Sequence, residues 1–368
     1  MLNCVVIGTG IAGLASAIRL RAKDYHVTMF EANNYAGGKL RELQTDGYRF
    51  DIGPTILTQP HLIDELFEIH GKNPRDYFSY SKLKNQFKYF FEDGTCINAY
   101  DDTTLFEKEI EENTIDNKYT FRKYLKDIET KYNITREVFI ENSLHIPSNY
   151  LNKNILYGLL NIRKIDAFKT MNQKNKSFFK DSKTVQIFNH FASHVGSNPF
   201  VAAATLNVIQ HFELNMGTYF PDKGMYSIVT SILKLAEEIG VKIEFNSYVN
   251  EIMTSNGKAI GVKVNNKEVP SDIIISNMDI YYTYKKLLPS YPSPKGIKQS
   301  KSTSIIGFYW NINRAFPELE THNMFFSTND ELEFHKLFND TKRTSCGLDL
   351  VRLSHDFICM TGTIVLDS

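Results

Sequence analysis

The chain has 368 residues, 42% of them hydrophobic and 23% charged, which is the balance of a globular protein and excludes bulk disorder. Its 42 basic residues (Lys and Arg) equal its 42 acidic residues, so no net charge favours nucleic acid as a partner. The four cysteines form no C-x-x-C pair and no His cluster accompanies them, so we expect neither a zinc nor an iron–sulfur site.

The N-terminus predicts a cytoplasmic protein. An apolar strand begins at Leu2, with no basic segment before it and no signal-peptide cleavage site after it. The sequence contains no stretch of about 18 apolar residues, which excludes a conventional membrane-spanning helix. We therefore expect any membrane contact to be peripheral, on the inner face of the cell membrane.

A glycine-rich turn lies between a predicted strand and a predicted helix. Residues 3–8 form a short apolar run typical of a strand buried on both faces, and an amphipathic segment runs from Leu14 to about Lys23. The turn between them has the pattern G-x-G-x-x-G and consists of Gly8, Thr9, Gly10, Ile11, Ala12 and Gly13. In this pattern the glycines allow a tight turn, close approach of a pyrophosphate, and close packing of the helix on the sheet. The phosphates then lie at the positive end of the helix.

A second predicted strand supports dinucleotide binding. The apolar run 26–30 ends at Glu31 and Ala32, about 20 residues beyond the glycines. An acid at this position accepts hydrogen bonds from the hydroxyl groups of the adenosine ribose. Because strand, glycine turn, helix, strand and acid follow in this order, we interpret the N-terminus as a dinucleotide-binding βαβ unit.

Two further motifs distinguish FAD from NAD as the cofactor. Gly37-Gly38-Lys39-Leu40 follows the acid, and residues 47–55 read GYRFDIGPT. In order and spacing these segments resemble the flavin-dependent amine oxidase and phytoene desaturase superfamily, apart from Asp24, where the family usually has Gly. The resemblance implies that the cofactor is FAD. It also implies that Gly38, Lys39 and Leu40 contact the FAD phosphates and that Gly53, Pro54 and Thr55 lie near the flavin.

The next segment predicts a helix, a hairpin and a charged helical region. Residues 59–70 have helical spacing, and the runs 87–91 and 96–100 flank an Asp93-Gly94 turn typical of a β-hairpin. Between residues 101 and 142, charged and apolar residues alternate at helical spacing. We interpret the acidic side chains there as a solvated helix face, formed by Glu107, Glu109, Glu111, Glu112 and Asp116.

Residues 151–180 have the pattern of a basic amphipathic helix. Apolar residues recur near helical spacing at Leu151, Ile155, Leu159, Ile162 and Ile165. Asp166 is the only acid, among the basic residues Lys153, Arg163, Lys164, Lys169, Lys174, Lys176 and Lys180. Such a helix can lie in the lipid headgroup plane, which predicts contact with a membrane surface. The alternative is a helix of the substrate domain with a solvated basic edge.

Two later segments, 191–200 and 217–225, resemble bacterial carotenoid desaturases. They read FASHVGSNPF and GTYFPDKGM, and Lys223 stands where those enzymes usually have Gly. Within this group, residues 142–145 and 164–170 are most similar to the hydroxycarotenoid 3,4-desaturase branch, followed by the phytoene desaturase branch.

The sequence then returns to the nucleotide domain. Residues 228–239 predict a helix closed by Gly240, followed by a strand at 241–245 and a strand pair at 259–264 and 268–269. Residues 271–277 predict a strand that rejoins the nucleotide sheet. The resemblance implies that the backbone of Val249 contacts the adenine of FAD.

These elements predict an α/β fold. A Rossmann-like FAD-binding domain of the amine oxidase and phytoene desaturase type is expected in residues 1–100 and 226–285. An inserted α+β substrate domain is expected in residues 101–225, the part that also faces the membrane, and in residues 286–342. Residues 343–368 form a divergent tail.

The end of the sequence departs from the resemblance, which runs from residue 3 to about residue 340. Family members continue with a loop rich in glycine and proline, which opens a helix facing the flavin. After Gly307 only Gly347 and Gly362 occur, and neither fits such a loop. We expect the chain to lack this C-terminal part through a frameshift near Lys342; the alternative is a divergent but complete short enzyme.

The resemblance implies FAD-dependent desaturation of a carotenoid, such as phytoene or a hydroxycarotenoid. FAD accepts one hydrogen as hydride, while the protein orients an apolar polyene in a long aromatic-lined tunnel. No catalytic residue is predicted. Asp51 is interpreted as tying a loop together, and His194 and His211 are equally consistent with an acid–base role and with core histidines. Two alternatives stay open: an FAD-dependent amine oxidase, and a truncated, catalytically inactive remnant of the flavin fold.

Overall fold

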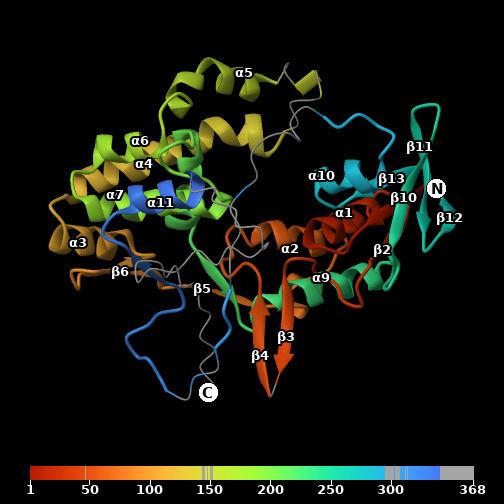
Figure 1. Cartoon of the computed structure of the whole chain (residues 1–368), viewed down its shortest axis with the longest axis horizontal. Coiled ribbons are helices and arrows are strands. Elements are labelled where there is room, and N and C mark those ends of the chain that lie inside the picture. The colour runs from red at the N-terminus through yellow and green to blue at the C-terminus, as the bar shows by residue number, and fades with distance from the viewer. Residues whose placement is uncertain are drawn as a thin grey trace. The chain divides into compact units, whose positions relative to one another are not determined.

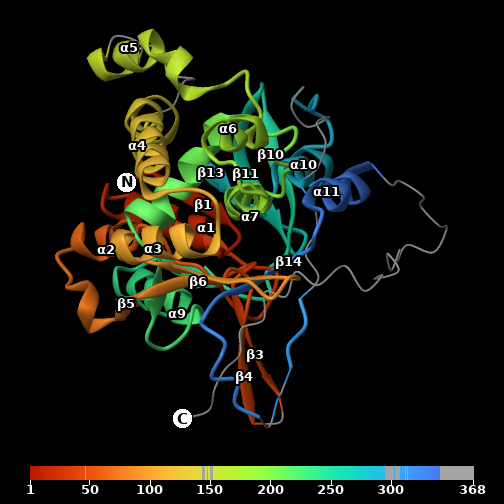
Figure 2. The same ribbon diagram turned by 90° about the vertical axis from the view of Figure 1, so that its left-hand side faces the viewer.

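The computed structural model describes residues 1–45, 47–142, 152–294 and 314–339, together with 146, 148, 149, 302, 307–310 and 312. These residues form two compact units (Figures 1 and 2). The first unit contains the described residues of Met1–Lys82 and Tyr219–Ser300, and the second contains those of Leu83–Thr218 and Lys301–Ser368. The expected tail 343–368, the site of the expected frameshift and residues 143–145 lie outside the described residues. The domain ranges expected from the sequence stay predictions.

A parallel four-stranded sheet organises the first unit. It consists of β1 (Asn3–Ile7), β2 (His26–Phe30), β9 (Lys242–Glu244) and β13 (Ile273–Ser276), in the order β13-β1-β2-β9. All three neighbouring pairs are parallel, which is the beginning of a doubly wound nucleotide-binding sheet. The predicted return of residues 271–277 to this sheet is confirmed, because β13 pairs with β1.

The two faces of this sheet are covered by different elements. Because side chains alternate along a strand, Cys4 and Val6 point to one face, where they pack against α1 (Ile11–Arg21) and α9 (Tyr226–Glu238). Val5 and Ile7 point to the other face. There they pack against a three-stranded antiparallel sheet, shown in Figure 1, that consists of β10 (Val249–Ser255), β11 (Lys258–Val264) and β12 (Lys267–Pro270).

Shorter elements complete the first unit. They are the hairpin β3 (Arg41–Thr45) and β4 (Tyr48–Ile52), α2 (His61–Glu68), η1 (Pro74–Asp76), the antiparallel pair β5 (Tyr80–Lys82) and β8 (Tyr219–Pro221), α10 (Ile280–Tyr282) and η8 (Thr283–Leu287). The backbone at Asp24 explains why the family usually has Gly at this position. Its φ is 60°, a left-handed conformation that glycine adopts freely and that Asp tolerates.

The second unit combines a small sheet with helices. The predicted hairpin is confirmed as β6 (Asn85–Phe91) and β7 (Cys96–Tyr100), and β14 (Asn323–Phe326) pairs with β6 in parallel. The helices are α3 (Thr103–Asn113), α4 (Lys118–Thr135), η2 (Arg136–Ile140), α5 (Lys153–Leu160), η4 (Ile162–Ile165), α6 (Met171–Phe178), α7 (Ser182–Asn189), η5 (His190–Val195), η6 (Ala204–Asn207), α8 (Val208–Gln210), η7 (His211–Asn215) and α11 (Asp330–Asn339). Aromatic rings fill its interior: Tyr124 lies 4.6 Å from Phe188, which stacks on Phe179 at 4.8 Å between centroids.

The interpretation of residues 101–142 as a solvated acidic face is wrong for two of its acids. Glu107 is buried, and both oxygens of its carboxylate accept hydrogen bonds from Arg122, at 2.6 and 2.7 Å. Asp116 is also buried and accepts hydrogen bonds from the backbone N–H groups of Lys180 and Asp181. These acids are buried because partners from other segments satisfy their charge.

Residues 151–180 form three helices rather than one. The chain turns at Asp166, whose φ is 54°, and Thr170 caps the next helix in a capping box with Gln173. Lys174, expected on an exposed basic face, is largely buried, with 11% of its side chain exposed. Leu151, which was expected on the apolar face, lies outside the described residues.

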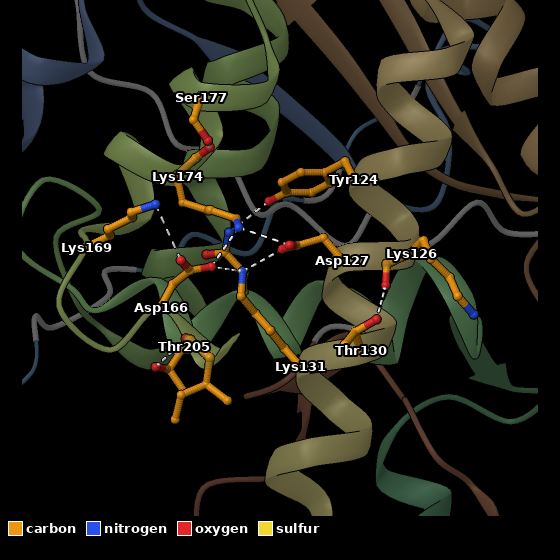
Figure 3. Close-up of polar contacts among 12 residues, drawn as sticks. Tyr124, Lys126, Asp127, Thr130, Lys131, Asp166, Lys169, Lys174, Ser177 and Thr205 are labelled. Atoms are coloured by element: carbon orange, nitrogen blue, oxygen red, sulfur yellow. Dashed lines mark hydrogen bonds and ion pairs between the residues drawn. The ribbon is translucent and has the colours of Figure 1, made fainter. Parts of the chain in front are cut away.

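A buried ion-pair cluster explains the position of Lys174 (Figure 3). The ammonium groups of Lys174 and Lys131 both contact Asp127, at 3.0 and 2.7 Å, and both contact Asp166, at 2.6 and 3.1 Å. The Lys131 side chain is completely buried. Two cations facing two carboxylates balance in charge and fix α6 and the turn at Asp166 against α4.

Candidate functional site

The glycine turn joins β1 to α1 at the carboxyl edge of the parallel sheet. Gly8 has a φ of 93°, a conformation that favours glycine, and its N–H donates to the carbonyl oxygen of Phe30 at 2.8 Å. Gly10 is the N-cap of α1 and provides no side-chain cap. The N–H groups of the first turn, 11–13, therefore have no acceptor within the helix and form its positive end. Such an end binds phosphate groups.

Close packing explains the other two glycines of the turn. A Cβ at position 13 would overlap the carbonyl oxygen of Gly8 and would lie 3.0 Å from Nδ2 of Asn277. A Cβ at Gly10 would lie 2.8 Å from the same nitrogen. The turn therefore presents bare backbone, onto which a ligand can fit closely.

Glu31 lies beside this turn and is held there by hydrogen bonds. The carboxylate is buried; its Oε2 accepts from the N–H of Thr9 at 2.9 Å and from its hydroxyl at 2.7 Å. Oε1 accepts from the N–H and the side-chain amide of Asn33, at 2.9 and 2.8 Å. Burial alone would raise the pKa of Glu31, but these hydrogen bonds outweigh it and hold the pKa below its usual range. Glu31 is thus a carboxylate fixed at the end of β2.

The two family motifs meet the glycine turn. The N–H of Gly37 donates to the carbonyl oxygen of Thr9 at 2.9 Å, and a Cβ at Gly38 would lie 3.3 Å from the Cα of Gly10. A Cβ at Gly53 would overlap the carbonyl oxygen of Lys39. Three segments separated in the sequence therefore form one continuous backbone surface. The predicted contact residues differ in exposure along this surface. Four are exposed: Gly38, Lys39, Gly53 and Pro54. Thr55 is half-buried, and Leu40 is buried in the core.

The expected adenine contacts lie on the other side of Glu31. The N–H of Ser247 donates to the carbonyl oxygen of Glu31 at 2.7 Å, and that of Asn246 donates to Asn33 at 3.0 Å. The segment leading to Val249 therefore runs beside Ala32, which is exposed. The Val249 side chain is buried in the core, so only its backbone is available to a ligand.

The interpretation of Asp51 as a residue that ties a loop together is confirmed. Its carboxylate accepts hydrogen bonds from the N–H groups of Met225 and Tyr226, at 2.7 and 3.1 Å, and from Arg49 at 3.0 Å. Asp51 therefore connects β4 to the beginning of α9, and the carbonyl oxygen of Lys223 accepts a further hydrogen bond from Arg49.

The two histidines considered in the sequence have partners in the second unit. Nδ1 of His194 lies 3.0 Å from a carboxylate oxygen of the buried Glu213. His211 is buried, stacks on Tyr132, and shares a hydrogen bond of 2.8 Å with the side-chain amide of Asn215. His211 is therefore buried, as expected of a core histidine, whereas His194 is exposed and is not one. Among the described residues no group of three or more His, Cys, Asp or Glu could hold a metal ion.

Sequence reasoning missed Thr9 and Asn277. Thr9 stands at a variable position of the glycine motif, so nothing in the motif indicated its contact with Glu31. Asn277 follows the returning strand β13, and its side chain lies against Gly10 and Gly13. The sequence predicted that this strand returns to the sheet but not that it pairs with β1, so no signal in the sequence located this contact.

Comparison with known proteins assigns the family. The profile of a family described as flavin containing amine oxidoreductase matches residues 11–344. A 1-hydroxycarotenoid 3,4-desaturase of Flavobacterium sp. (strain P99-3) is 40% identical over 92% of this chain and 70% of its own length. A 4,4'-diapolycopene oxygenase of Methylomonas sp. is 32% identical over 91% of this chain and 67% of its own length.

Solved structures of similar fold are more distant. A putrescine oxidase triple mutant superposes with a TM-score of 0.55 at 15% identity, covering 81% of this chain and 62% of that protein. An oxidoreductase from Methanosarcina mazei gives a TM-score of 0.53 at 16% identity, covering 79% of this chain and 62% of that protein. The chain thus spans about two thirds of the length of the proteins it matches, and the expected α/β fold of the amine oxidase type is confirmed.

Proposed function

Because the chain belongs to the family of flavin containing amine oxidoreductases, we propose that it is an FAD-dependent oxidoreductase that desaturates a carotenoid. The observation that carries this proposal is its similarity to a curated hydroxycarotenoid desaturase, which extends over both units. The substrate class is an apolar polyene, such as phytoene or a hydroxycarotenoid. A ligand without polar groups has to be oriented by the shape of an apolar site.

The residues around the glycine turn fit FAD. The first-turn N–H groups of α1 would hold the pyrophosphate over Gly10, and the carboxylate of Glu31 would accept hydrogen bonds from the ribose. Gly38 and Lys39 would contact the phosphates, Leu40 could do so only through its backbone because its side chain is buried in the core, and Gly53, Pro54 and Thr55 would lie near the flavin. Ala32 and the backbone of Val249 would border the adenosine. Bound FAD supplies the hydride acceptor, whereas the protein binds, orients and excludes water.

We also propose that the second unit binds a membrane surface peripherally. Three apolar residues are strongly exposed. They are Leu156 and Leu160 on α5 and Phe168 beyond η4, and Phe168 is completely exposed. The α5 surface consists of these residues and of Tyr157, Ile162, Arg163 and Lys164, which are also exposed. A segment that exposes both apolar and basic side chains suits the headgroup region of an anionic bilayer.

The opposite side of α5 supports this orientation. Ile155 is buried, and a Cβ at Gly158 would overlap the side chain of Val138. The helix therefore packs closely on η2 through one side, and Leu156, Tyr157 and Leu160 on its other side are exposed. No helix among the described residues is long and apolar enough to cross a bilayer. Contact at the inner face of the cell membrane would also give access to an apolar substrate.

An anaerobic single-turnover experiment tests the proposed reaction. Purified protein loaded with FAD is mixed without oxygen with a 1-hydroxycarotenoid in liposomes, and in parallel with phytoene and with putrescine. Loss of the oxidised flavin absorbance, together with a carotenoid product extended by one double bond, is the expected result for a carotenoid. Reduction by putrescine alone would support an amine oxidase, and no reduction by any of the three would support an inactive remnant.

A further inference from the structure

Asn277 lies at the point where the parallel sheet is open to a ligand. β2 and β13 flank β1 on opposite sides, and in open α/β sheets ligands bind outside the carboxyl ends of the strands at such a switch point. Asn277 is the first residue after β13, and its N–H donates to the carbonyl oxygen of Ile7 at 2.9 Å. The side chain therefore emerges at the carboxyl edge of the sheet, next to Gly8.

The Asn277 carboxamide is placed directly against the glycine turn. Its Nδ2 would lie 2.8 Å from a Cβ at Gly10 and 3.0 Å from a Cβ at Gly13. Two glycines of the motif thus make room for this one side chain. Within the described residues the carboxamide makes no hydrogen bond, although Asn277 is half-buried. An amide nitrogen carries two donor hydrogens, so its capacity to donate is available to a ligand.

We propose that the Asn277 carboxamide donates a hydrogen bond to the pyrophosphate of the bound dinucleotide. This inference rests on the proposed function, and it adds a side-chain donor to the backbone N–H groups of α1. The first helical turn and the carboxamide adjoin the same bare backbone at Gly10, which is where the phosphates would lie. A neutral donor there stabilises the anion at every pH, whereas a carboxylate would repel it.

Ligand affinities of three variants test the inference. Dissociation constants are measured for FAD by flavin fluorescence, and for ADP and adenosine by calorimetry, with the protein freed of cofactor. Because a hydrogen bond to a charged group is lost, Asn277→Ala should weaken FAD and ADP by about tenfold or more. Asn277→Asp should weaken both further, and neither change should alter adenosine binding. Asn256→Asp introduces the same charge in the exposed turn between β10 and β11 and should leave all three affinities unchanged.

The outcomes separate this inference from the proposed function. If the wild-type protein binds no FAD, the proposed function itself is contradicted. If the wild-type protein binds FAD and both Asn277 variants bind it equally well, only the inference is overturned. Equal weakening of adenosine and ADP would also overturn it, because the effect would then lie outside the pyrophosphate. Thermal unfolding of the cofactor-free variants checks that each one folds.

Discussion

Thr9 donates two hydrogen bonds to a single carboxylate oxygen of Glu31, from its backbone N–H at 2.9 Å and from its hydroxyl at 2.7 Å. The residue between the first two glycines of the turn is thereby joined to the acid at the end of the next strand. The two parts of the dinucleotide motif, 22 positions apart, therefore hold each other in place before any ligand binds. Such preorganisation lowers the entropy lost on binding.

Replacing Glu31 with Gln should weaken both folding and FAD binding. A Gln side chain presents an NH2 group to donors, so at least one hydrogen bond from Thr9 or Asn33 is lost and a buried donor is left unpaired. We expect the free energy of unfolding to fall by about 1–3 kcal/mol and FAD affinity to fall with it. Urea unfolding and FAD titration measure the two effects. Unchanged values for both would contradict the structural role of Glu31.

The same carboxylate predicts a pH dependence of stability. Its pKa in the folded protein lies below the usual value for Glu, because the hydrogen bonds from Thr9 and Asn33 outweigh the effect of burial. A carboxyl group with a lowered pKa stabilises the fold above its unfolded pKa and loses this effect as the pH falls through the folded pKa. Wild-type stability should therefore decline in acid more steeply than that of Glu31→Gln. Parallel pH curves would show that Glu31 does not contribute.

Gly13→Ala should disrupt the contact between α1 and β1. The new Cβ would overlap the carbonyl oxygen of Gly8, which is backbone and cannot rotate away. We expect a loss of about 1–3 kcal/mol in unfolding free energy, as for other overpacked sites, and loss of FAD from the purified protein. Ser16→Ala, one turn further along the same helix, is the control and should retain FAD. A yellow, stable Gly13→Ala protein would contradict this packing.

The α5 surface should be needed for binding to anionic liposomes. Leu160→Ser combined with Phe168→Ser removes two strongly exposed apolar side chains and should reduce co-sedimentation with vesicles several-fold. Ile115→Ser is the control, because Ile115 lies elsewhere in the same unit and is as exposed as Leu160. Adding Lys164→Glu should weaken binding further at low salt. Equal binding by all variants would exclude this surface as the membrane contact.

Asp166→Asn should strongly destabilise the second unit. Asn tolerates the left-handed backbone at this position, but it leaves Lys131 and Lys174 with one carboxylate, that of Asp127. Breaking a buried ion pair in this way costs about 3–5 kcal/mol of unfolding free energy. Glu112→Gln, which removes an exposed pair with Lys108, should have little effect. Similar chemical denaturation curves for both variants would contradict the role of the cluster.

The sequence predicted the parts of the fold that depend on local patterns. The strand, glycine turn and helix at residues 3–21 are set by short-range chemistry, and the return of residues 271–277 follows from a short apolar run typical of a strand. By contrast, the burial of Glu107 and Lys174 depends on partners 15 and 47 positions away, which no local pattern reveals. From the sequence alone, these charged residues are equally consistent with a solvated helix face.

The candidate site, like the fold, was predicted from the sequence only in part. The glycines and Glu31 belong to a motif with a known spatial arrangement, and the structure brings them together. Asn277 stands apart from that motif in the sequence, and it reaches the turn only because β13 lies next to β1 in the sheet. Strand order is a property of the whole unit, so this contact became visible only in three dimensions.

The most direct test of the account is the flavin content of the purified protein. FAD added to the cofactor-free chain should bind in a ratio of about one to one and give a visible flavin spectrum. Gly10→Leu should abolish this binding, because a Cβ at this position would already lie 2.8 Å from Nδ2 of Asn277 and the larger side chain would crowd the turn. A wild-type chain that binds no FAD, or a Gly10→Leu chain that binds it normally, would contradict the central claim that the backbone at Gly10 holds the dinucleotide.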